Sequence, residues 1–327
     1  MENLYPIKFK PILKEKIWGG GKLQNILGKS SAKQNKIGES WEMSGVEDNI
    51  SIASNGFLAG NNLNEVIEVY MGDLVGDKIY EQFGNEFPLL IKFIDASDDL
   101  SIQVHPDDSY AKENHQAYGK TEMWYILQAD EGAELTTGFS KEISKGEYIS
   151  ALNSANLKNI LNVEKVTEGD VFFIPPGRVH AIGPDILLTE IQQTSDLTYR
   201  IYDWGRLGDD GKPRELHTDL ALDVIDFNVY KNYKTDYEWK LDKTANILKC
   251  PYFTTNILEF ETPVSKDYNL IDSFVIFICV QGNFEIKYNQ NDVEKINFGE
   301  TVLLPSVLKN IDLIPKGKAK LLEVYID

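Results

Sequence analysis

Apolar and polar positions follow two different periods along the chain. Residues 63–83, LNEVIEVYMGDLVGDKIYEQF, carry apolar side chains at spacings of three and four with charges between them, which predicts one or two short amphipathic helices. From Leu89 onward, short β-branched and aromatic runs are separated by Gly, Pro, Asn and Asp, as in strands joined by turns. The expected strands are PLLIKFIDA, LSIQVHP, EMWYILQA, AELTTGF, DVFFIPP, ILLTEIQQ and TYRIYDW. Regular short strands of this kind predict a mainly β fold, either a barrel or a jelly roll.

The strand pattern occurs twice. EGDVFFIPPGRVHAIG at 168–183 is matched by FGETVLLPSVLKNIDL at 298–313, each with Gly, an acid, an alternating apolar strand and then Pro. A further strand pair precedes each copy, MWYILQADEGAELTTGF and FVIFICVQGNFEIKY. The repeat therefore predicts two barrels. The expected ranges are an N-terminal barrel over 1–207 with the helical segment near 63–83, a connection over 208–250 with a short helix in LHTDLALDVIDF, and a C-terminal barrel over 251–327.

The composition is that of a large globular protein. A chain of 327 residues with 42% hydrophobic and 11% aromatic content can bury an extensive core. The formal charge of −18 disfavours binding to nucleic acid or an anionic membrane, so an anionic small substrate would need a local cationic pocket.

Compartment signals are few. The N-terminal stretch MENLYPIKFKPILKEK lacks a long apolar core, and no later run approaches transmembrane length. Cys250 and Cys279 are too few for a disulfide framework and have no metal-type spacing, which favours a reduced, cytoplasmic setting. The oligomeric state is left open between monomer and homodimer.

Four ligand-capable residues are placed where strands could bring them together. Gln103 and His105 lie two positions apart in SIQVHPDD, so an extended chain points both side chains the same way. Glu122 begins an apolar run, where an unpaired carboxylate would be costly to bury, and His180 follows the rigid turn of IPPGRV. Two imidazoles with carboxylate and amide oxygens suit a borderline divalent metal such as zinc and leave a position open.

The other two histidines serve as controls. His115 lies in the polar stretch KENHQAYGK, and His217 lies in ELHTDL at an expected helix start. Both are interpreted as solvated side chains and not as metal ligands.

The motifs QVHPDD, GKTEMWYIL, IPPGRVHAIG and TYRIYDWGR, in this order, resemble those of the type I mannose-6-phosphate isomerases (phosphomannose isomerases) of the cupin superfamily. The resemblance runs from KPILKEKIWGG to the last strand and includes GESWEMS at 38–44. The short interval between Glu122 and His180 leaves no room for the helical insertion of the longer eukaryotic-type enzymes, so the chain is similar to the short bacterial form. The resemblance implies two cupin (jelly-roll) barrels with a small helical segment, the second barrel without a metal because 307–310 contains no histidine.

The resemblance also implies a reaction and a division of roles. Mannose 6-phosphate and fructose 6-phosphate would be interconverted through a cis-enediolate, with one Zn²⁺ per chain on the four ligands. Arg200 would stabilise the enediolate, while either Lys120 or Glu190 would transfer the proton. Lys92, Ser101 and Lys120 would bind the phosphate. The structural alternative for Arg200 is a salt bridge with Asp203 or Glu190.

Two other classes of protein fit parts of the pattern. A non-catalytic sugar-binding cupin could keep the barrel, but it would have no reason to retain four ligands together with Arg200 and Lys120. A different cupin metalloenzyme, such as an iron oxygenase or a cupin-type glucose-phosphate isomerase, more often has a histidine pair where this chain has Gln103 and His105. Metal analysis and an assay on mannose 6-phosphate would separate the three.

Overall fold

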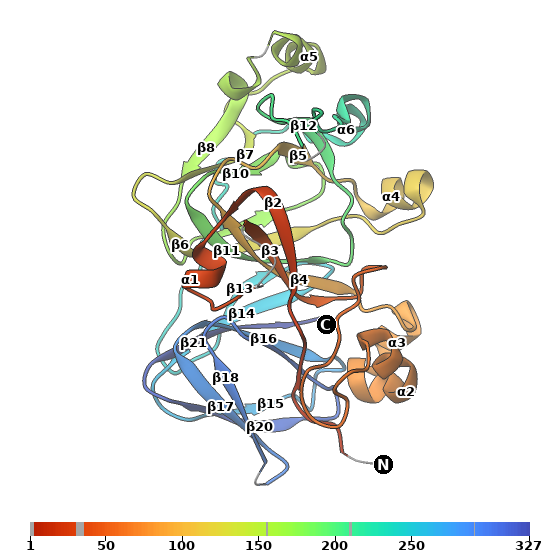
Figure 1. The fold of residues 1–327 in the computed structure, drawn as a ribbon, viewed down its shortest axis with the longest axis vertical. Coiled ribbons are helices and arrows are strands. Elements are labelled where there is room, and N and C mark those ends of the chain that lie inside the picture. The colour runs from red at the N-terminus through yellow and green to blue at the C-terminus, as the bar shows by residue number, and fades with distance from the viewer. Residues whose placement is uncertain (1–2, 31–35, 155, 209–210, 291) are drawn as a thin grey trace. The chain divides into compact units, whose positions relative to one another are not determined.

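The computed structural model describes residues 3–30, 36–154, 156–208, 211–290 and 292–327 and is mainly β (Figure 1). Contacts between Cα atoms divide the chain into two units, each built from separate stretches of sequence. The terminal unit comprises Met1–Ile12, Glu42–Leu89 and Asp236–Asp327, and the central unit comprises Leu13–Trp41 and Leu90–Thr235.

Two sheets make up most of the central unit. The five-stranded sheet has the order β12 (Tyr199–Tyr202), β5 (Ile102–Val104), β10 (His180–Ile182), β7 (Glu134–Phe139) and β8 (Leu161–Lys165). The six-stranded sheet has the order β2 (Ile12–Gly20), β3 (Ile37–Ser44), β4 (Leu89–Ala96), β11 (Ile186–Gln193), β6 (Glu122–Ala129) and β9 (Val171–Ile174). The described helices of the central unit are α1 (Lys22–Asn25), α4 (Asp108–His115), α5 (Lys145–Asn153), the 3₁₀ turn η1 (Leu157–Ile160) and α6 (Thr218–Val224).

The inner faces of these two sheets share one hydrophobic core. Trp124 and Phe172 from the six-stranded sheet pack in the same buried cluster as Leu135 and Ile182 from the five-stranded sheet. A second cluster contains Val104 and residues of α5 and α6, so it covers the other face of the five-stranded sheet. Because side chains alternate along a strand, the polar residues between these apolar positions are directed to the opposite face.

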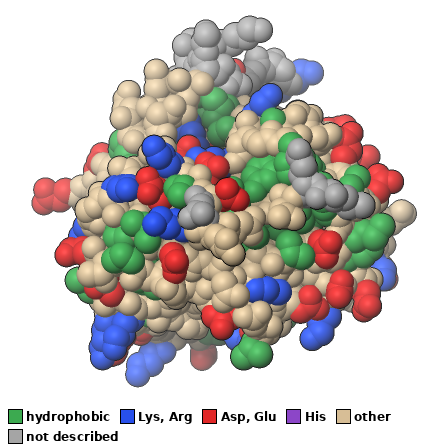
Figure 2. Space-filling view, turned by 90° about the horizontal axis from the view of Figure 1, so that it is seen from below, with side chains coloured by type: hydrophobic (Ala, Val, Ile, Leu, Met, Phe, Trp, Pro, Cys, Tyr) green, Lys and Arg blue, Asp and Glu red, His purple; other side chains and the backbone are tan. Residues whose placement is uncertain are grey.

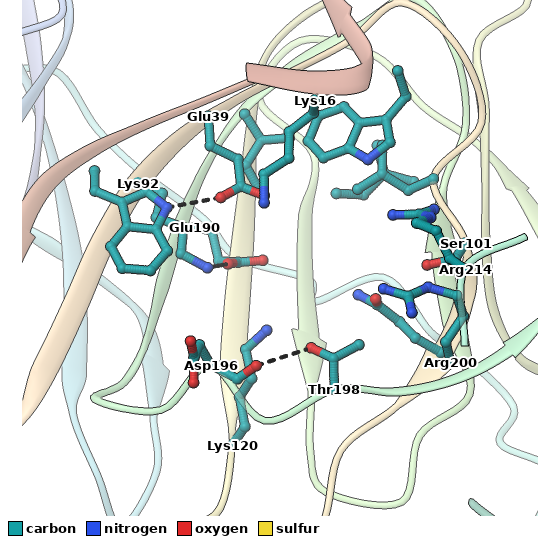
Figure 3. Close-up of a pocket in the computed structure, with 16 residues that line it drawn as sticks. Lys16, Glu39, Lys92, Ser101, Lys120, Glu190, Asp196, Thr198, Arg200 and Arg214 are labelled. Atoms are coloured by element: carbon teal, nitrogen blue, oxygen red, sulfur yellow. Dashed lines mark hydrogen bonds and ion pairs between the residues drawn. The ribbon is translucent and has the colours of Figure 1, made fainter. Parts of the chain in front are cut away.

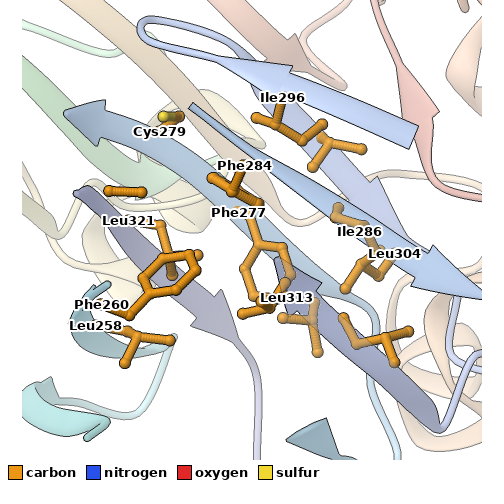
Figure 4. Close-up of a cluster of buried hydrophobic side chains, with 14 of the residues drawn as sticks. Leu258, Phe260, Phe277, Cys279, Phe284, Ile286, Ile296, Leu304, Leu313 and Leu321 are labelled. Carbon is orange, nitrogen blue, oxygen red and sulfur yellow. The ribbon is translucent and has the colours of Figure 1, made fainter. Parts of the chain in front are cut away.

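The terminal unit also contains two sheets. The six-stranded sheet has the order β1 (Ile7–Lys8), β19 (Thr301–Leu304), β16 (Val275–Gln281), β21 (Ala319–Tyr325), β14 (Thr254–Phe260) and β13 (Ala245–Lys249). The four-stranded sheet has the order β15 (Val264–Asp267), β20 (Asn310–Pro315), β17 (Asn283–Tyr288) and β18 (Asp292–Asn297). Phe260 and Phe277 from the first sheet pack with Phe284, Ile286 and Leu313 from the second (Figure 4).

The helices predicted over 63–83 are confirmed as α2 (Leu63–Val75) and α3 (Asp77–Phe83). Asn62 and Glu65 form a capping box at the start of α2: the Asn62 side chain accepts from the Glu65 N–H, and the Glu65 carboxylate accepts from the Asn62 N–H. The Asp272 carboxylate accepts from the N–H groups of Asp77 and Lys78 at the start of α3. A local capping box therefore marks the start of α2, whereas the start of α3 is capped by a carboxylate that is distant in the sequence.

The strand predictions from Leu89 onward are confirmed by β4, β5, β6, β7, β9, β11 and β12. The repeated segments at 168–183 and 298–313 each contain two strands, β9 and β10 in the first and β19 and β20 in the second, and in both cases the two strands lie in different sheets. The short helix within LHTDLALDVIDF is α6. The helices α4 and α5 were not predicted, although each begins at a capping residue, Asp107 and Ser144.

The observed units differ from the consecutive ranges expected from the sequence. β1 pairs with β19, with Ile7 opposite Leu303, so the first residues belong with the last ones. The α2–α3 segment also belongs to the terminal unit, and the segment 208–250 is divided between the units at residue 235. The cause is long-range strand pairing, which local sequence patterns do not encode.

The described surface carries charges of both signs. On the face in Figure 2, acidic and basic side chains are interspersed with apolar ones, and the visible Lys and Arg residues do not form one continuous stripe. Within the part of the chain that the structure describes, no helix is both long and apolar enough to cross a membrane.

The core of the terminal unit generates a stability prediction. Phe284 is 1% exposed, so Phe284→Ala should lower the free energy of unfolding by about 3–5 kcal/mol, as lost burial and a residual cavity act together. Leu270, which is fully exposed, is the matched control, and Leu270→Ala should change it by less than about 0.5 kcal/mol. Urea unfolding followed by circular dichroism measures both. Equal losses in the two variants would contradict the assigned core.

Candidate metal centre and cavity

His105, Glu122 and His180 meet inside the central unit. Their candidate ligand atoms lie within 4.8 Å of one another, and all three side chains are buried. Glu122 Oε1 is 3.3 Å from His180 Nε2, and Glu122 Oε2 is 3.6 Å from His105 Nε2. Among the described residues, this is the one group of three or more His, Cys, Asp or Glu side chains arranged to hold a metal ion.

Strand register brings these residues together. His180 begins β10 and lies opposite Gln103 of β5, while Glu122 begins β6 in the facing sheet. Ile102 and Val104, the neighbours of Gln103, pack in the cluster on the other face, so the Gln103 side chain points inward. His105 follows β5 directly.

Backbone carbonyls orient both imidazole rings. Nδ1 of His105 lies 2.8 Å from the Leu197 carbonyl, and Nδ1 of His180 lies 2.8 Å from the Arg178 carbonyl. Since a carbonyl oxygen only accepts, Nδ1 carries the hydrogen in each ring and Nε2 presents its lone pair to the cluster. Burial lowers the pKa of His180 to about 3 and that of His105 well below its usual value, so both rings stay neutral as ligands must be.

The turn before His180 is held by close backbone contacts. The Gly177 N–H donates to the His105 carbonyl at 2.9 Å, and the Gly177 carbonyl accepts from the Asp226 N–H at 2.9 Å. Gly177 has φ +82, and a Cβ there would lie 2.8 Å from the Val224 carbonyl oxygen. This turn therefore requires glycine both for its conformation and for space.

Gln103 is placed to be a fourth ligand. Its side-chain amide nitrogen lies 3.2 Å from His180 Nε2. Rotation of the terminal amide by half a turn exchanges its nitrogen and oxygen, so an oxygen can occupy the same position. The structure thus brings together all four residues that the sequence singled out as ligands.

The group fits a divalent cation chemically. Glu122 is 0% exposed, and its Oε1 has no hydrogen-bond donor among the described residues. Burial, followed by the Glu190 charge, raises the pKa of Glu122 to about 7 even though Lys120 Nζ lies 2.9 Å from Oε2. Two neutral nitrogens around an under-compensated carboxylate are a donor set to which a divalent metal would supply the missing charge.

A cavity of about 330 Å³ lies next to this group, since Gln103 and Lys120 line it (Figure 3). Five of its described lining side chains are cationic and three are acidic, in contrast to the net charge of the whole chain. The charged lining residues are Lys16, Lys92, Lys120, Arg200, Arg214, Glu39, Glu190 and Asp196. Such a local cationic pocket is what an anionic substrate would need in a chain with a net charge of −18.

Each ammonium group of the cavity is paired with a carboxylate. Lys92 Nζ lies 2.9 Å from Glu190 Oε1 and donates to Gln192 Oε1 at 2.6 Å. Lys16 Nζ lies 3.0 Å from Glu39 Oε1, and Lys120 is paired with Glu122 as above. Burial raises the pKa of Glu190, but Lys92 and Lys120 lower it to a net value below its usual range. The positive charge of each of these lysines is therefore largely balanced by the carboxylate beside it.

Arg200 is differently placed. It lies opposite Gln103 in the β12–β5 pair, and its Nη1 donates to the Glu215 carbonyl at 2.9 Å. A purely structural Arg200 was expected to form a salt bridge with Asp203 or Glu190. Within the described residues it forms neither ion pair, and its buried Nε has no acceptor. The Asp203 carboxylate is instead bound by Arg206 and Arg214.

The remaining predicted residues have definite places. Ser101 lines the cavity, and Glu190 Oε2 accepts from Trp124 Nε1 at 2.9 Å. His115 ends α4 and its Nε2 contacts the Tyr199 hydroxyl at 2.6 Å, while His217 precedes α6 and accepts from the Arg200 N–H. Neither control histidine belongs to the metal-competent group.

Sequence reasoning missed several cavity residues on β2 and β3. Lys16 and Trp18 lie two positions apart on β2, and Glu39 and Trp41 lie two positions apart on β3. The two side chains of each pair therefore share a face of their strand, and all four line the cavity. Trp41 Nε1 donates to Glu39 Oε2 at 2.7 Å. Strand alternation within GESWEMS was a usable signal for the second pair. Arg214 was also missed, and it lies outside any strand.

Fold and site together define a class, that of mainly β proteins with a buried, metal-competent His/Glu/His group beside a cation-lined cavity. The family model "Phosphomannose isomerase type I, catalytic domain" matches residues 7–142. Mannose-6-phosphate isomerase of Streptococcus mutans is 33% identical over 312 residues, covering 93% of this chain and 94% of that protein. The probable mannose-6-phosphate isomerase GmuF of Bacillus subtilis is 40% identical over 301 residues, covering 85% of this chain and 92% of that protein. The chain belongs to the type I phosphomannose isomerase family.

Solved structures agree with this assignment. A crystal structure of mannose 6-phosphate isomerase from Bacillus subtilis is 32% identical, with a TM-score of 0.89 and coverage of 98% of this chain and 99% of that one. A putative mannosephosphate isomerase from Archaeoglobus fulgidus has a TM-score of 0.78 with 99% coverage of both chains, and at 20% identity it shows the shared fold alone.

The metal centre generates a binding prediction. After incubation with zinc and desalting, the protein should retain about one metal ion per chain by elemental analysis, because the described residues contain one suitable group. His105→Ala or His180→Ala should each release it, and joint replacement of Glu122 and His180 should remove all of it. His115→Ala is the matched control and should keep the metal. Two ions per chain, with one surviving the double replacement, would show a second site.

Proposed function

We propose that this chain interconverts mannose 6-phosphate and fructose 6-phosphate. The observation that carries the proposal is the neutral, oriented His105/His180 pair with buried Glu122, beside a cavity rich in cations. Relatives of similar length that are named mannose-6-phosphate isomerase support the choice of substrate.

We assign a single Zn²⁺ per chain to Gln103, His105, Glu122 and His180. Nitrogen and oxygen donors of this kind suit zinc, and four ligands still leave room for a substrate oxygen in an expanded coordination shell. When bound, the metal would act as a Lewis acid on the substrate oxygens at C1 and C2.

Arg200 is our candidate for stabilising negative charge. Moving a proton between C1 and C2 passes through a cis-enediolate, whose charge develops on the two oxygens. Arg200 lies opposite the ligand Gln103 and has no carboxylate partner among the described residues, so its charge is available to an anion. A fixed guanidinium aimed at developing charge stabilises a transition state more than a ground state.

Two groups are candidates for proton transfer. Glu190 lines the cavity and is held by Lys92 and Trp124. Lys120 also lines it, between Glu122 Oε2 and His105 Nε2, which lies 3.2 Å away. Either side chain is fixed in position by buried partners, which a proton-transferring group requires. The choice between them stays open.

Phosphate binding by Lys92, Lys120 and Ser101 stays a prediction. All three line the same cavity, which supports it. The ion pairs of the two lysines mean that they would contribute hydrogen-bond donors more than free positive charge.

We also propose that the two sheet pairs are two cupin (jelly-roll) barrels, a catalytic one and a degenerate one without metal. In each, two sheets pack face to face around an apolar core. Glu300, the acid of the repeated segment, pairs with Lys8 at 3.1 Å and is not part of the group of described residues that could hold a metal. A cytoplasmic location is part of the same proposal.

The decisive assay couples fructose 6-phosphate formation from mannose 6-phosphate to a spectrophotometric readout. Turnover should be lost on exhaustive chelation and return with zinc, since the metal supplies the Lewis acid. Full activity in protein shown to be metal-free by elemental analysis would overturn the metal role. An enzyme active on other sugars and inert on mannose 6-phosphate would overturn the substrate.

Arg200 provides a second test. Arg200→Ala should lower kcat about a hundredfold or more, roughly 3 kcal/mol, with a smaller change in KM, because the charge matters most in the transition state. His115→Ala, on the neighbouring α4, is the control and should keep wild-type turnover. Normal turnover in a folded Arg200→Ala enzyme would refute the assignment, and a fall in thermal stability alone would indicate a structural role.

A further inference from the structure

Two guanidinium groups lie on one side of the cavity. Figure 3 shows Arg200, Arg214 and Ser101 together, across from Lys92 and Glu190. Ser101 is 4% exposed, and its hydroxyl has no hydrogen-bond partner among the described residues. This arginine side is therefore the part of the cavity where donors are left over.

Asp203 holds Arg214 in place. Arg214 Nε donates to Asp203 Oδ2 at 2.6 Å, and Arg214 Nη2 donates to Asp203 Oδ1 at 2.5 Å, a two-point contact that fixes the guanidinium plane. Asp203 is 5% exposed, and Nη1 of Arg214 has no acceptor among the described residues. The outer nitrogen of an oriented guanidinium is thus free beside the cavity.

The local charge count favours an anion. Arg206 binds the same Asp203 carboxylate at 2.7 Å, so one buried carboxylate faces two guanidiniums, with Arg200 nearby as a third. Arg206 also lies 3.6 Å from Asp98, which is 61% exposed and screened by solvent, and its charge acts on Asp99 as well. Of the two arginines that line the cavity, Arg200 has no carboxylate partner among the described residues and Arg214 shares its carboxylate with Arg206, so this side favours an anion. Lys92 lies on the opposite side and is neutralised by Glu190, so of the three phosphate contacts predicted from the sequence this site keeps Ser101 and replaces the two lysines with Arg214.

We propose that Arg214, oriented by Asp203, binds the phosphate group of the sugar phosphate substrate together with the Ser101 hydroxyl. The assignment rests on the proposed function for the identity of the substrate. Arginine suits the role because its planar fork presents several donors to phosphate oxygens at once, whereas a lysine offers a point charge. Asp203 is then a positioning residue, since it acts through Arg214.

The test compares two arginines that share Asp203. Arg214→Gln should raise KM for mannose 6-phosphate and the inhibition constant of inorganic phosphate by about tenfold to a hundredfold, the loss expected for a charged hydrogen bond, with kcat changed only a few-fold. Arg206→Gln, whose side chain does not line the cavity, should leave both constants near wild type. Arg214→Lys should recover part of the loss. Thermal unfolding of each variant reports any general loss of stability.

Several outcomes would overturn the proposal. Unchanged constants in a folded Arg214→Gln protein, or equal increases in the Arg206→Gln protein, would show that Arg214 has only a structural role. If the wild type lacks isomerase activity, the proposed function fails, and calorimetric titration of the zinc-loaded protein with inorganic phosphate tests Arg214 separately. Binding that is lost in Arg214→Gln supports the anion site, and no binding to the wild type refutes it.

Discussion

The burial of the Glu122 carboxylate is the constraint around which the central unit is organised. An ionised carboxylate without compensation is far too costly in the interior of a sheet pair, and the surroundings meet this constraint from several directions. Lys120 pairs with it, two imidazole nitrogens face it, and the second buried acid, Glu190, is held by Lys92 and Trp124. These groups come from several strands and from the segments beside them, so the polar centre constrains the strand register as well as what the centre can bind.

Much of this centre could be predicted from alternation along single strands. Gln103 faces inward because its neighbours are apolar and belong to the other face, and the rigid turn before His180 is visible as Pro and Gly in the sequence. The same rule would have placed Glu39 and Trp41, which lie two residues apart on β3. Arg214 could not be predicted in this way because it lies outside helices and strands, where no periodic pattern indicates which way a side chain points. The discontinuous units could not be predicted because β1 pairs with β19, which lies almost 300 residues further along the chain.

The cavity also shows how an acidic protein can receive an anion. The net charge of −18 belongs to the chain as a whole, whereas the cationic side chains of the cavity differ in whether a carboxylate balances them. Lysines are matched with carboxylates and so keep their positions, whereas the arginines outnumber the single buried carboxylate that they share. Composition alone predicts repulsion, and the arrangement of ion pairs reverses that prediction locally.

The strand order of the terminal unit has a consequence for synthesis on the ribosome. β21, the last strand of the chain, lies between β16 and β14 in the middle of its six-stranded sheet, and β1, the first, pairs at the edge of that sheet. This sheet cannot close until β21, which ends at Tyr325, has been synthesised. The central unit, in contrast, has all of its residues once position 235 has emerged. The unit that holds the metal ligands can therefore fold co-translationally, while the first strand waits unpaired for a partner almost 300 residues later.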